Sequence, residues 1–163
     1  ALEGAVMGGG FGLACVADVV LAANTAVFRL PETSLGLLPA QIAPFMLARL
    51  GYSETKRLSV SGGKIDAAEA LTIRLVHSVH ESSAALDAAV SSTLDKIHAC
   101  APEATRATKA LLMRAYTEQN DGIGALVDHA AGLFAGAFRG PEAQEGIAAF
   151  LQKRKPSWAE PKD

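Results

Sequence analysis

The feature that most constrains this chain is a glycine triplet placed between two apolar segments near its start. Residues 2–38 read LEGAVMGGGFGLACVADVVLAANTAVFRLPETSLGLL, with the triplet at residues 8–10. The short apolar run before it is typical of a strand, and the apolar residues after it are spaced widely enough to surround a buried helix. The sequence therefore predicts a strand, a glycine turn and a helix in direct succession.

Glycines at a helix start can serve two purposes. Because they lack a Cβ, Gly8, Gly9 and Gly10 let another group approach the backbone closely. The first N–H groups of a helix also point outward with the positive end of its dipole behind them, so such a corner can hold a negatively charged oxygen. The alternative is that the triplet only allows a strand and a helix to pack tightly. The residues alone leave both readings open.

An acidic residue comes near the end of the same stretch. After the strand-like segments VVLAA and AVFRL, Pro31 is followed directly by Glu32, which has apolar runs on both sides. A carboxylate beside a largely apolar wall either caps a turn or acts as a base. Glu32 is therefore a candidate for either role.

Four blocks of sequence carry a resemblance to a known family. They occur in the order GAVMGGGFGLACVADVVLAA, FRLPETSLGLLPA, GYSETKRLSVSGGKIDAAEAL and EGIAAFLQKRKPSW. Together they resemble the C-terminal part of the enoyl-CoA hydratase/isomerase (crotonase) superfamily over nearly the whole chain. Within it, PETSLGLLPAQIAPFMLARLG is similar to the isohexenylglutaconyl-CoA hydratases of acyclic terpene breakdown and, less closely, to the methylglutaconyl-CoA hydratases.

The resemblance implies an α/β fold with two parts. Residues 1–80 would form part of a crotonase-like ββα spiral core, and residues 81–163 an all-helical oligomerisation tail. In the family this tail packs trimers together, so a homotrimer, or a hexamer made of two trimers, is implied. A mostly helical tail on a monomer is the alternative.

The resemblance also implies an enzyme that acts on an acyl-CoA thioester, with coenzyme A as part of the substrate and no separate cofactor. By position, the Gly9 amide would supply one half of an oxyanion hole, and Glu32 matches a catalytic glutamate that activates water or moves a proton. Further substrate contacts are implied at Gly8, Gly12, Ala40 and Gln41.

Two residues of the tail match positions that bind the adenine and phosphate end of coenzyme A in the family. These are Phe150 and Lys153, in the segment FLQK. Any amphipathic helix end can show the same spacing, with the phenylalanine in the core and the lysine in solvent. Both interpretations stay open at this stage.

One position departs from the family pattern. Typical hydratases carry a second glutamate two residues after the glycine triplet, and here Gly12 stands at that position. Glu32 would then both take a proton from water and return one to the substrate, unless Gln41 or a carboxylate of a glutaconyl-type substrate assists. Two alternatives to hydration stay open: an isomerase that moves a double bond with Glu32 alone, and a non-catalytic oligomerisation or interaction piece.

The chain opens on Ala1, Leu2, Glu3 and Gly4, which already belong to an expected strand. In the family, an N-terminal half of alternating strands and helices comes before this point. That half supplies the second oxyanion-hole amide and much of the coenzyme A pocket. We therefore expect this chain to be part of a longer protein.

Charge and cysteine usage argue against several classes of partner. Fifteen Lys and Arg residues stand against 17 Asp and Glu residues, and a net charge of -2 gives no basic field for nucleic acid. No apolar run reaches the roughly 18 residues of a membrane span. Cys15 and Cys100 lack a paired spacing, which favours free thiols and a cytoplasmic location. No metal site is expected from the four histidines, His77, His80, His98 and His129.

Helix boundaries are well marked in the middle of the chain. Residues 41–50 predict an apolar helix with Pro44 in its first turn, ended by Gly51. Ser53 begins the next helix, which residues 62–63 end. Asp66 is expected to cap a short helix over residues 67–71.

The second half of the chain is predicted to be helical. Residues 75–79 alternate like a strand, and Arg74 stands where the family commonly has a glycine, so a positive φ there would lower stability. Helices are then expected over residues 83–101, 103–119, 125–138 and 142–155.

Overall fold

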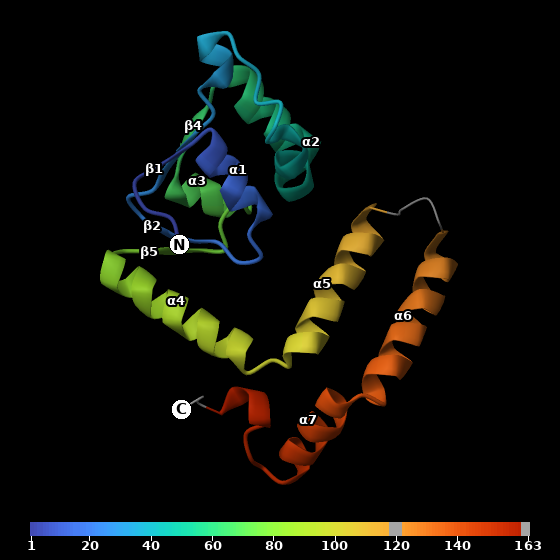
Figure 1. Cartoon of the computed structure of the whole chain (residues 1–163). Coiled ribbons are helices and arrows are strands. Elements are labelled where there is room, and N and C mark those ends of the chain that lie inside the picture. The colour runs from blue at the N-terminus through green and yellow to red at the C-terminus, as the bar shows by residue number, and fades with distance from the viewer. Residues whose placement is uncertain (118–121, 161–163) are drawn as a thin grey trace. The chain divides into compact units, whose positions relative to one another are not determined.

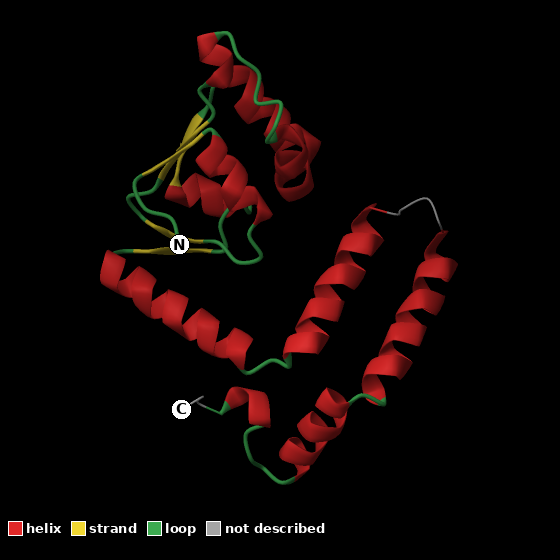
Figure 2. Ribbon diagram, in the orientation of Figure 1, coloured by secondary structure: helices red, strands yellow, loops and turns green. Residues whose placement is uncertain are grey.

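The computed structural model describes residues 1–117 and 122–160 (Figures 1 and 2). The chain divides into two compact units, Ala1–Ser92 and Thr93–Asp163. The first contains all the strands of the described residues and the second is helical. This is the helix-rich α/β architecture expected for the C-terminal part of a crotonase fold, so the predicted fold class is confirmed.

Two small sheets form the framework of the first unit. Strands β1 (Ala5–Met7), β3 (Val27–Arg29) and β4 (Lys64–Asp66) pair in the order β1-β3-β4, with β1 parallel and β4 antiparallel to β3. Strands β2 (Leu21–Ala23) and β5 (Ser78–His80) form a parallel pair. The strands β2 and β3 lie within the segments VVLAA and AVFRL that predicted them.

Helices surround the core of the first unit. They are α1 (Gly9–Val16), the 3-10 helix η1 (Glu32–Leu35), α2 (Ala43–Ser61) and α3 (Ala67–Thr72). Phe11 of α1 and Phe28 of β3 are fully buried and meet edge to face, with ring centroids 6.3 Å apart. This contact fixes the start of α1 against the strand that leads toward Glu32. The predicted succession of strand, glycine turn and helix is confirmed.

The helix-ending signals read from the sequence act as expected. Gly51 interrupts α2 with φ 71° and ψ 175°, and Gly62 ends it in the left-handed region with φ 59°. The Asp66 side chain accepts a hydrogen bond of 2.8 Å from the Glu69 N–H and so caps α3. The glycines and the cap therefore divide residues 43–72 into helices by local chemistry.

The strand predicted over residues 75–79 is wrong in its bounds, since β5 covers Ser78–His80. The N–H groups of Leu75 and Val76 both donate to the Ala70 carbonyl oxygen, at 2.9 and 3.2 Å, and so close the turn that follows α3. Both side chains are buried. An apolar pair in a buried turn imitates the alternation of a short strand.

After β5 the chain forms α4 (Ser83–His98), α5 (Pro102–Thr117), α6 (Gly122–Phe138), α7 (Pro141–Leu151) and the 3-10 helix η3 (Ser157–Ala159). Residues 122–124 belong to α6, where the sequence predicted a break before residue 125. The predicted end of the preceding helix at Gln119 lies outside the described residues. Among those that are described, no helix has the length and apolar character that a membrane span requires.

Carboxylates hold the end of the chain in the second unit. Glu142 of α7 accepts from the N–H groups of Glu103 and Ala104 at 2.9 and 3.0 Å, at the start of α5. Glu145 forms a two-point ion pair with Arg154, at 2.7 and 2.8 Å, and accepts from the Ser157 N–H at 2.8 Å. These hydrogen bonds lower the pKa of Glu145 to about 2.

Arg74, at a position where the family commonly has glycine, adopts φ 62°, the positive value that would lower stability there. We expect Arg74→Gly to raise the free energy of unfolding by about 0.5–1 kcal/mol, because the left-handed strain of an L-residue exceeds the extra entropy of an unfolded glycine. Denaturant unfolding of the chain measures this change. Arg74→Ala is the control, since it removes the guanidinium but keeps the strain. Equal stabilisation by both variants would place the effect in the side chain.

The Glu145 ion pair predicts a pH-dependent contribution to stability. The pKa of about 2 for Glu145 in the folded protein lies below the ordinary glutamate value of 4.5. The contribution is therefore complete above about pH 4.5 and declines as the pH falls toward 2. Thermal unfolding of the chain and of Glu145→Gln between pH 7 and pH 2 should show a difference in Tm that shrinks over this window. A difference independent of pH would contradict the assignment.

Candidate active site

The glycine triplet forms a corner between β1 and α1. Gly8 adopts φ 51°, donates its N–H to the Arg29 carbonyl oxygen at 3.2 Å, and accepts from the Gly12 N–H at 3.1 Å. Gly9 is the first residue of α1, so its N–H has no acceptor within the helix. A Cβ added at Gly9 or Gly10 would meet no heavy atom within 4 Å, so the space beside the helix start is open.

Glu32 lies against this corner. Its Oε1 is 3.2 Å from the position that a Cβ on Gly8 would occupy, while its Oε2 is buried without a hydrogen-bond partner in the described residues. Pro31, not Glu32, is the N-cap residue of η1, and Glu32 lies in the first turn of this 3-10 helix. The structure therefore brings together Gly8, Gly9 and Glu32, which the sequence had singled out separately.

The 3-10 helix η1 holds Glu32 in place. Thr33 Oγ1 donates to the Ser59 carbonyl oxygen of α2 at 2.8 Å, and Ser34 Oγ donates to the Pro31 carbonyl oxygen at 2.6 Å. Gly36 ends the element in the left-handed region with φ 73°. The backbone of the glutamate is therefore tied both to its own turn and to α2.

The loop before α2 also reaches α1. Ala40 and Gln41 are exposed in a turn closed by the Ile42 N–H, which donates to the Pro39 carbonyl oxygen at 3.2 Å. A Cβ added at Gly12 would lie 2.4 Å from Ile42 Cγ2, which is a direct overlap. The sequence did not single out Ile42. Ile42 and Gly12 are 30 residues apart in the sequence, and no local sequence pattern predicts a contact between them.

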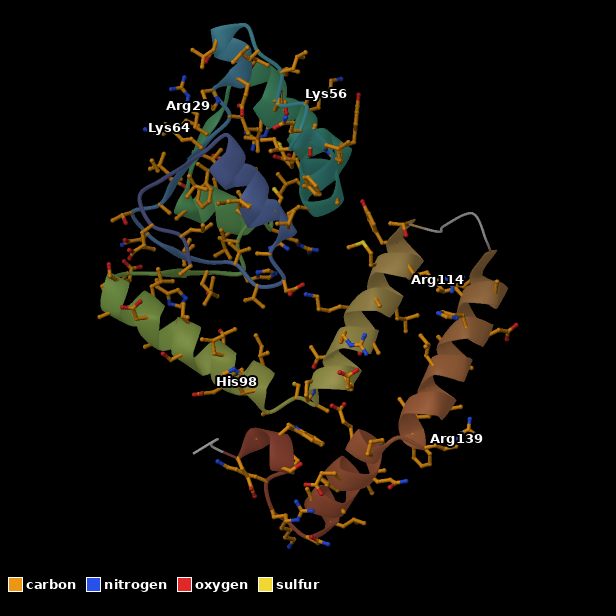
Figure 3. All side chains as sticks on the ribbon, in the orientation of Figure 1. Arg29, Lys56, Lys64, His98, Arg114 and Arg139 are labelled. Atoms are coloured by element: carbon orange, nitrogen blue, oxygen red, sulfur yellow. The ribbon has the colours of Figure 1, made fainter. Side chains whose placement is uncertain are left out.

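Positive charge lies beside the corner. Arg29, whose carbonyl accepts from Gly8, is in register with Lys64 of the antiparallel strand β4, and Figure 3 labels both. Directly opposite residues project to the same face of a sheet. Their neighbours Phe28 and Ile65 are buried on the other face. The two cations therefore share the sheet face away from the core, at the end of β3 that leads to Glu32.

Phe150 and Lys153 belong to the second unit. Phe150, in the last turn of α7, is 82 % exposed, so its interpretation as a core residue is wrong. Lys153 adopts φ 52° and donates its N–H to the Phe150 carbonyl oxygen at 3.1 Å. The side chain of Phe150 is thus available for a contact, and a role in binding coenzyme A stays a prediction for both residues.

The remaining candidates have structural explanations. Burial raises the pKa of the Cys15 thiol to about 11, against a smaller opposing effect of Arg49, which makes it a core residue rather than a nucleophile. His77 Nδ1 accepts from the Val20 N–H at 2.9 Å, and His80 Nε2 lies 2.8 Å from Ser78 Oγ. Over residues 1–117 and 122–160, no three His, Cys, Asp or Glu side chains are grouped as metal ligands.

Comparison with protein families gives a match over residues 1–161 to the family described as enoyl-CoA hydratase/isomerase. The chain belongs to the enoyl-CoA hydratase/isomerase family. A protein of Mycobacterium bovis named as a probable enoyl-CoA hydratase is 36 % identical over 159 residues, which are 97 % of this chain and 60 % of that protein. The chain thus spans about 60 % of the length of this relative.

Solved structures of family members match the fold closely. An enoyl-CoA hydratase/isomerase from Marinobacter aquaeolei is 51 % identical, with a TM-score of 0.92 over 97 % of this chain and 59 % of that one. The protein AtuE from Pseudomonas aeruginosa is also 51 % identical, with a TM-score of 0.91 over 97 % of this chain and 60 % of that one. At this identity the family and the fold are both shown.

Proposed function

We propose that the protein is an acyl-CoA enzyme of the enoyl-CoA hydratase type, which adds water to an α,β-unsaturated thioester. The observation that carries the proposal is the Glu32 carboxylate beside Gly8, next to the first N–H of α1 at Gly9. Membership of the enoyl-CoA hydratase/isomerase family supports it. A base and an oxyanion donor at one open corner are the groups that this chemistry needs.

The corner fits the charge that develops during hydration. The Glu32 carboxylate takes a proton from water as the water oxygen bonds to the β-carbon of the substrate. The electron pair of the double bond then moves to give an enolate, whose oxygen accepts from the Gly9 N–H at the helix start. A donor of this kind contributes about 3 kcal/mol of transition-state stabilisation. Glu32 finally returns the proton to the α-carbon.

Isomerisation is the second candidate reaction. Position 12 carries no acid in this chain. Glu32 is therefore the one carboxylate that was a candidate from the sequence and that also lies at the corner. In an isomerase the carboxylate breaks one C–H bond, the electron pair moves into the enolate, and the same proton forms a C–H bond at another carbon. Product analysis separates the reactions, because hydration yields a hydroxyacyl thioester and isomerisation a shifted enoyl thioester.

For the substrate, we propose a glutaconyl-type thioester such as the isohexenylglutaconyl-CoA of acyclic terpene breakdown. The similarity of PETSLGLLPAQIAPFMLARLG to that group of hydratases supports this choice. Gln41, exposed in the turn that precedes Ile42, is proposed to assist the single carboxylate. Phe150 and Lys153 are proposed to bind the adenine and phosphate end of coenzyme A.

The proposed assembly is a homotrimer or a hexamer of two trimers. Several large apolar side chains of α6 are exposed in the isolated chain, including those of Ile123, Val127, Phe134 and Phe138. Burial of such a face in an oligomer would stabilise the tail. The free thiols Cys15 and Cys100 support a proposed cytoplasmic location.

Replacing Glu32 by glutamine tests the proposed base. We expect Glu32→Gln to lower kcat with an enoyl-CoA substrate by about 10²–10⁴-fold, because the amide cannot carry the proton. Glu3→Gln is the matched control, since Glu3 is exposed outside the corner. Steady-state kinetics of the intact protein measure both variants. Similar rates for the two would remove Glu32 from the mechanism.

Replacing Gln41 by alanine tests the role proposed for Gln41. We expect Gln41→Ala to lower kcat/KM for a glutaconyl-type thioester by about tenfold, the value of one hydrogen bond, because the single carboxylate then acts without its assistance. Gln144→Ala in α7 is the control. Unchanged hydration of the glutaconyl-type thioester would end the role assigned to Gln41.

A further inference from the structure

The glycine face of α1 receives two side chains from the downstream segment. Gly8 and Gly12 are joined by the Gly12 N–H bond to the Gly8 carbonyl oxygen and lie one helical turn apart on the same face. Glu32 Oε1 occupies the space beside Gly8, and Ile42 Cγ2 occupies the space beside Gly12. An acid and a hydrocarbon side chain therefore lie next to each other along this face.

Ile42 fills the space beside Gly12 completely. A Cβ on Gly12 would lie 2.4 Å from Ile42 Cγ2, 3.0 Å from Ile42 Cβ and 4.0 Å from Ile42 Cα. A side chain at position 12 and a branched side chain at position 42 thus exclude each other. Glycine at position 42 would leave only the ordinary contact with Cα.

The backbone at Ile42 has little freedom to move away. Its N–H donates to the Pro39 carbonyl oxygen at 3.2 Å, and its carbonyl accepts from the Met46 N–H at 3.0 Å in the first turn of α2. Met46 is fully buried, and Ile42 itself packs against the core. As a β-branched residue, isoleucine also has few alternative rotamers. The contact with Gly12 is therefore held from both sides.

We infer that Ile42 is a positioning residue that keeps the corner a single-carboxylate site. The Ile42 side chain occupies the volume in which a second acid on α1 would lie. The neighbour of the Glu32 carboxylate along this helix face is therefore an apolar side chain. The catalytic part of the inference, that Glu32 is the one proton carrier on this face, rests on the proposed function. The steric part, that Ile42 excludes a side chain at position 12, is independent of any activity.

A cycle of stability measurements tests the packing. In the otherwise unchanged chain we expect Gly12→Ala to lower Tm by about 5 °C, because the added methyl overlaps Ile42. Gly12→Ala should cause the same loss of Tm in the Ile42→Val background, because valine keeps Cγ2. In the Ile42→Gly background, Gly12→Ala should no longer lower Tm, since alanine is otherwise the better helix former. Equal losses in all three backgrounds would overturn the inference.

A pH profile tests the catalytic part of the inference, that Ile42 excludes a second carboxylate from the site. In the intact protein, Gly12→Glu combined with Ile42→Gly should add an ionisation to the pH dependence of kcat/KM that Ile42→Gly alone lacks. Gly12→Glu with Ile42 in place should not add it, because its carboxylate has no room beside Glu32. The same added ionisation in both Gly12→Glu proteins would overturn the inference.

The two measurements separate the inference from the proposed function. If the unchanged intact protein neither hydrates nor isomerises enoyl thioesters, the proposed function fails, and the Tm cycle still decides whether Ile42 excludes a side chain at position 12. If the enzyme is active but the Tm losses are equal in every background, the inference about Ile42 fails alone.

Discussion

The first unit depends on a close approach between the glycine face of α1 and the segment from Glu32 to Ile42. Side chains at positions 8 and 12 would occupy the space that the carboxylate and the isoleucine now fill. The opposite constraint comes from Phe11, which is buried against β3 and prevents the helix from moving away. The corner exists because α1 has glycines on the face toward Glu32 and Ile42 and a large buried side chain, Phe11, on the face toward β3.

This arrangement connects packing with chemistry. The start of α1 at Gly9 directs an N–H outward, and the neighbouring Gly8 lets Glu32 come close to the same corner. Catalysis of acyl-CoA reactions through an enolate requires a donor for the oxygen and a proton carrier for the carbons. The proposed function therefore follows from two groups that a single turn of glycines brings together, within a family shown over nearly the whole chain.

The second unit is organised by capping and charge. The Glu142 carboxylate satisfies free N–H groups at the start of α5, and the Glu145 carboxylate holds both Arg154 and the Ser157 N–H. These contacts order the segment that follows α7, and Phe150 in the last turn of α7 is left exposed. An exposed aromatic side chain on an ordered helix end is suited to contact with another molecule, which agrees with the proposed role of Phe150 in binding coenzyme A.

The sequence by itself determined the elements whose signals are local. Gly51 and Gly62 end helices because few other residues accept their φ values, and Asp66 caps the helix that it begins. Only the tertiary structure decided what lies beside Gly12 and where β5 starts. The overlap with Ile42 joins residues far apart in the chain, and a buried turn at residues 75–76 imitates a strand. Periodicity reports which face is apolar, but it does not report which distant side chain that face meets.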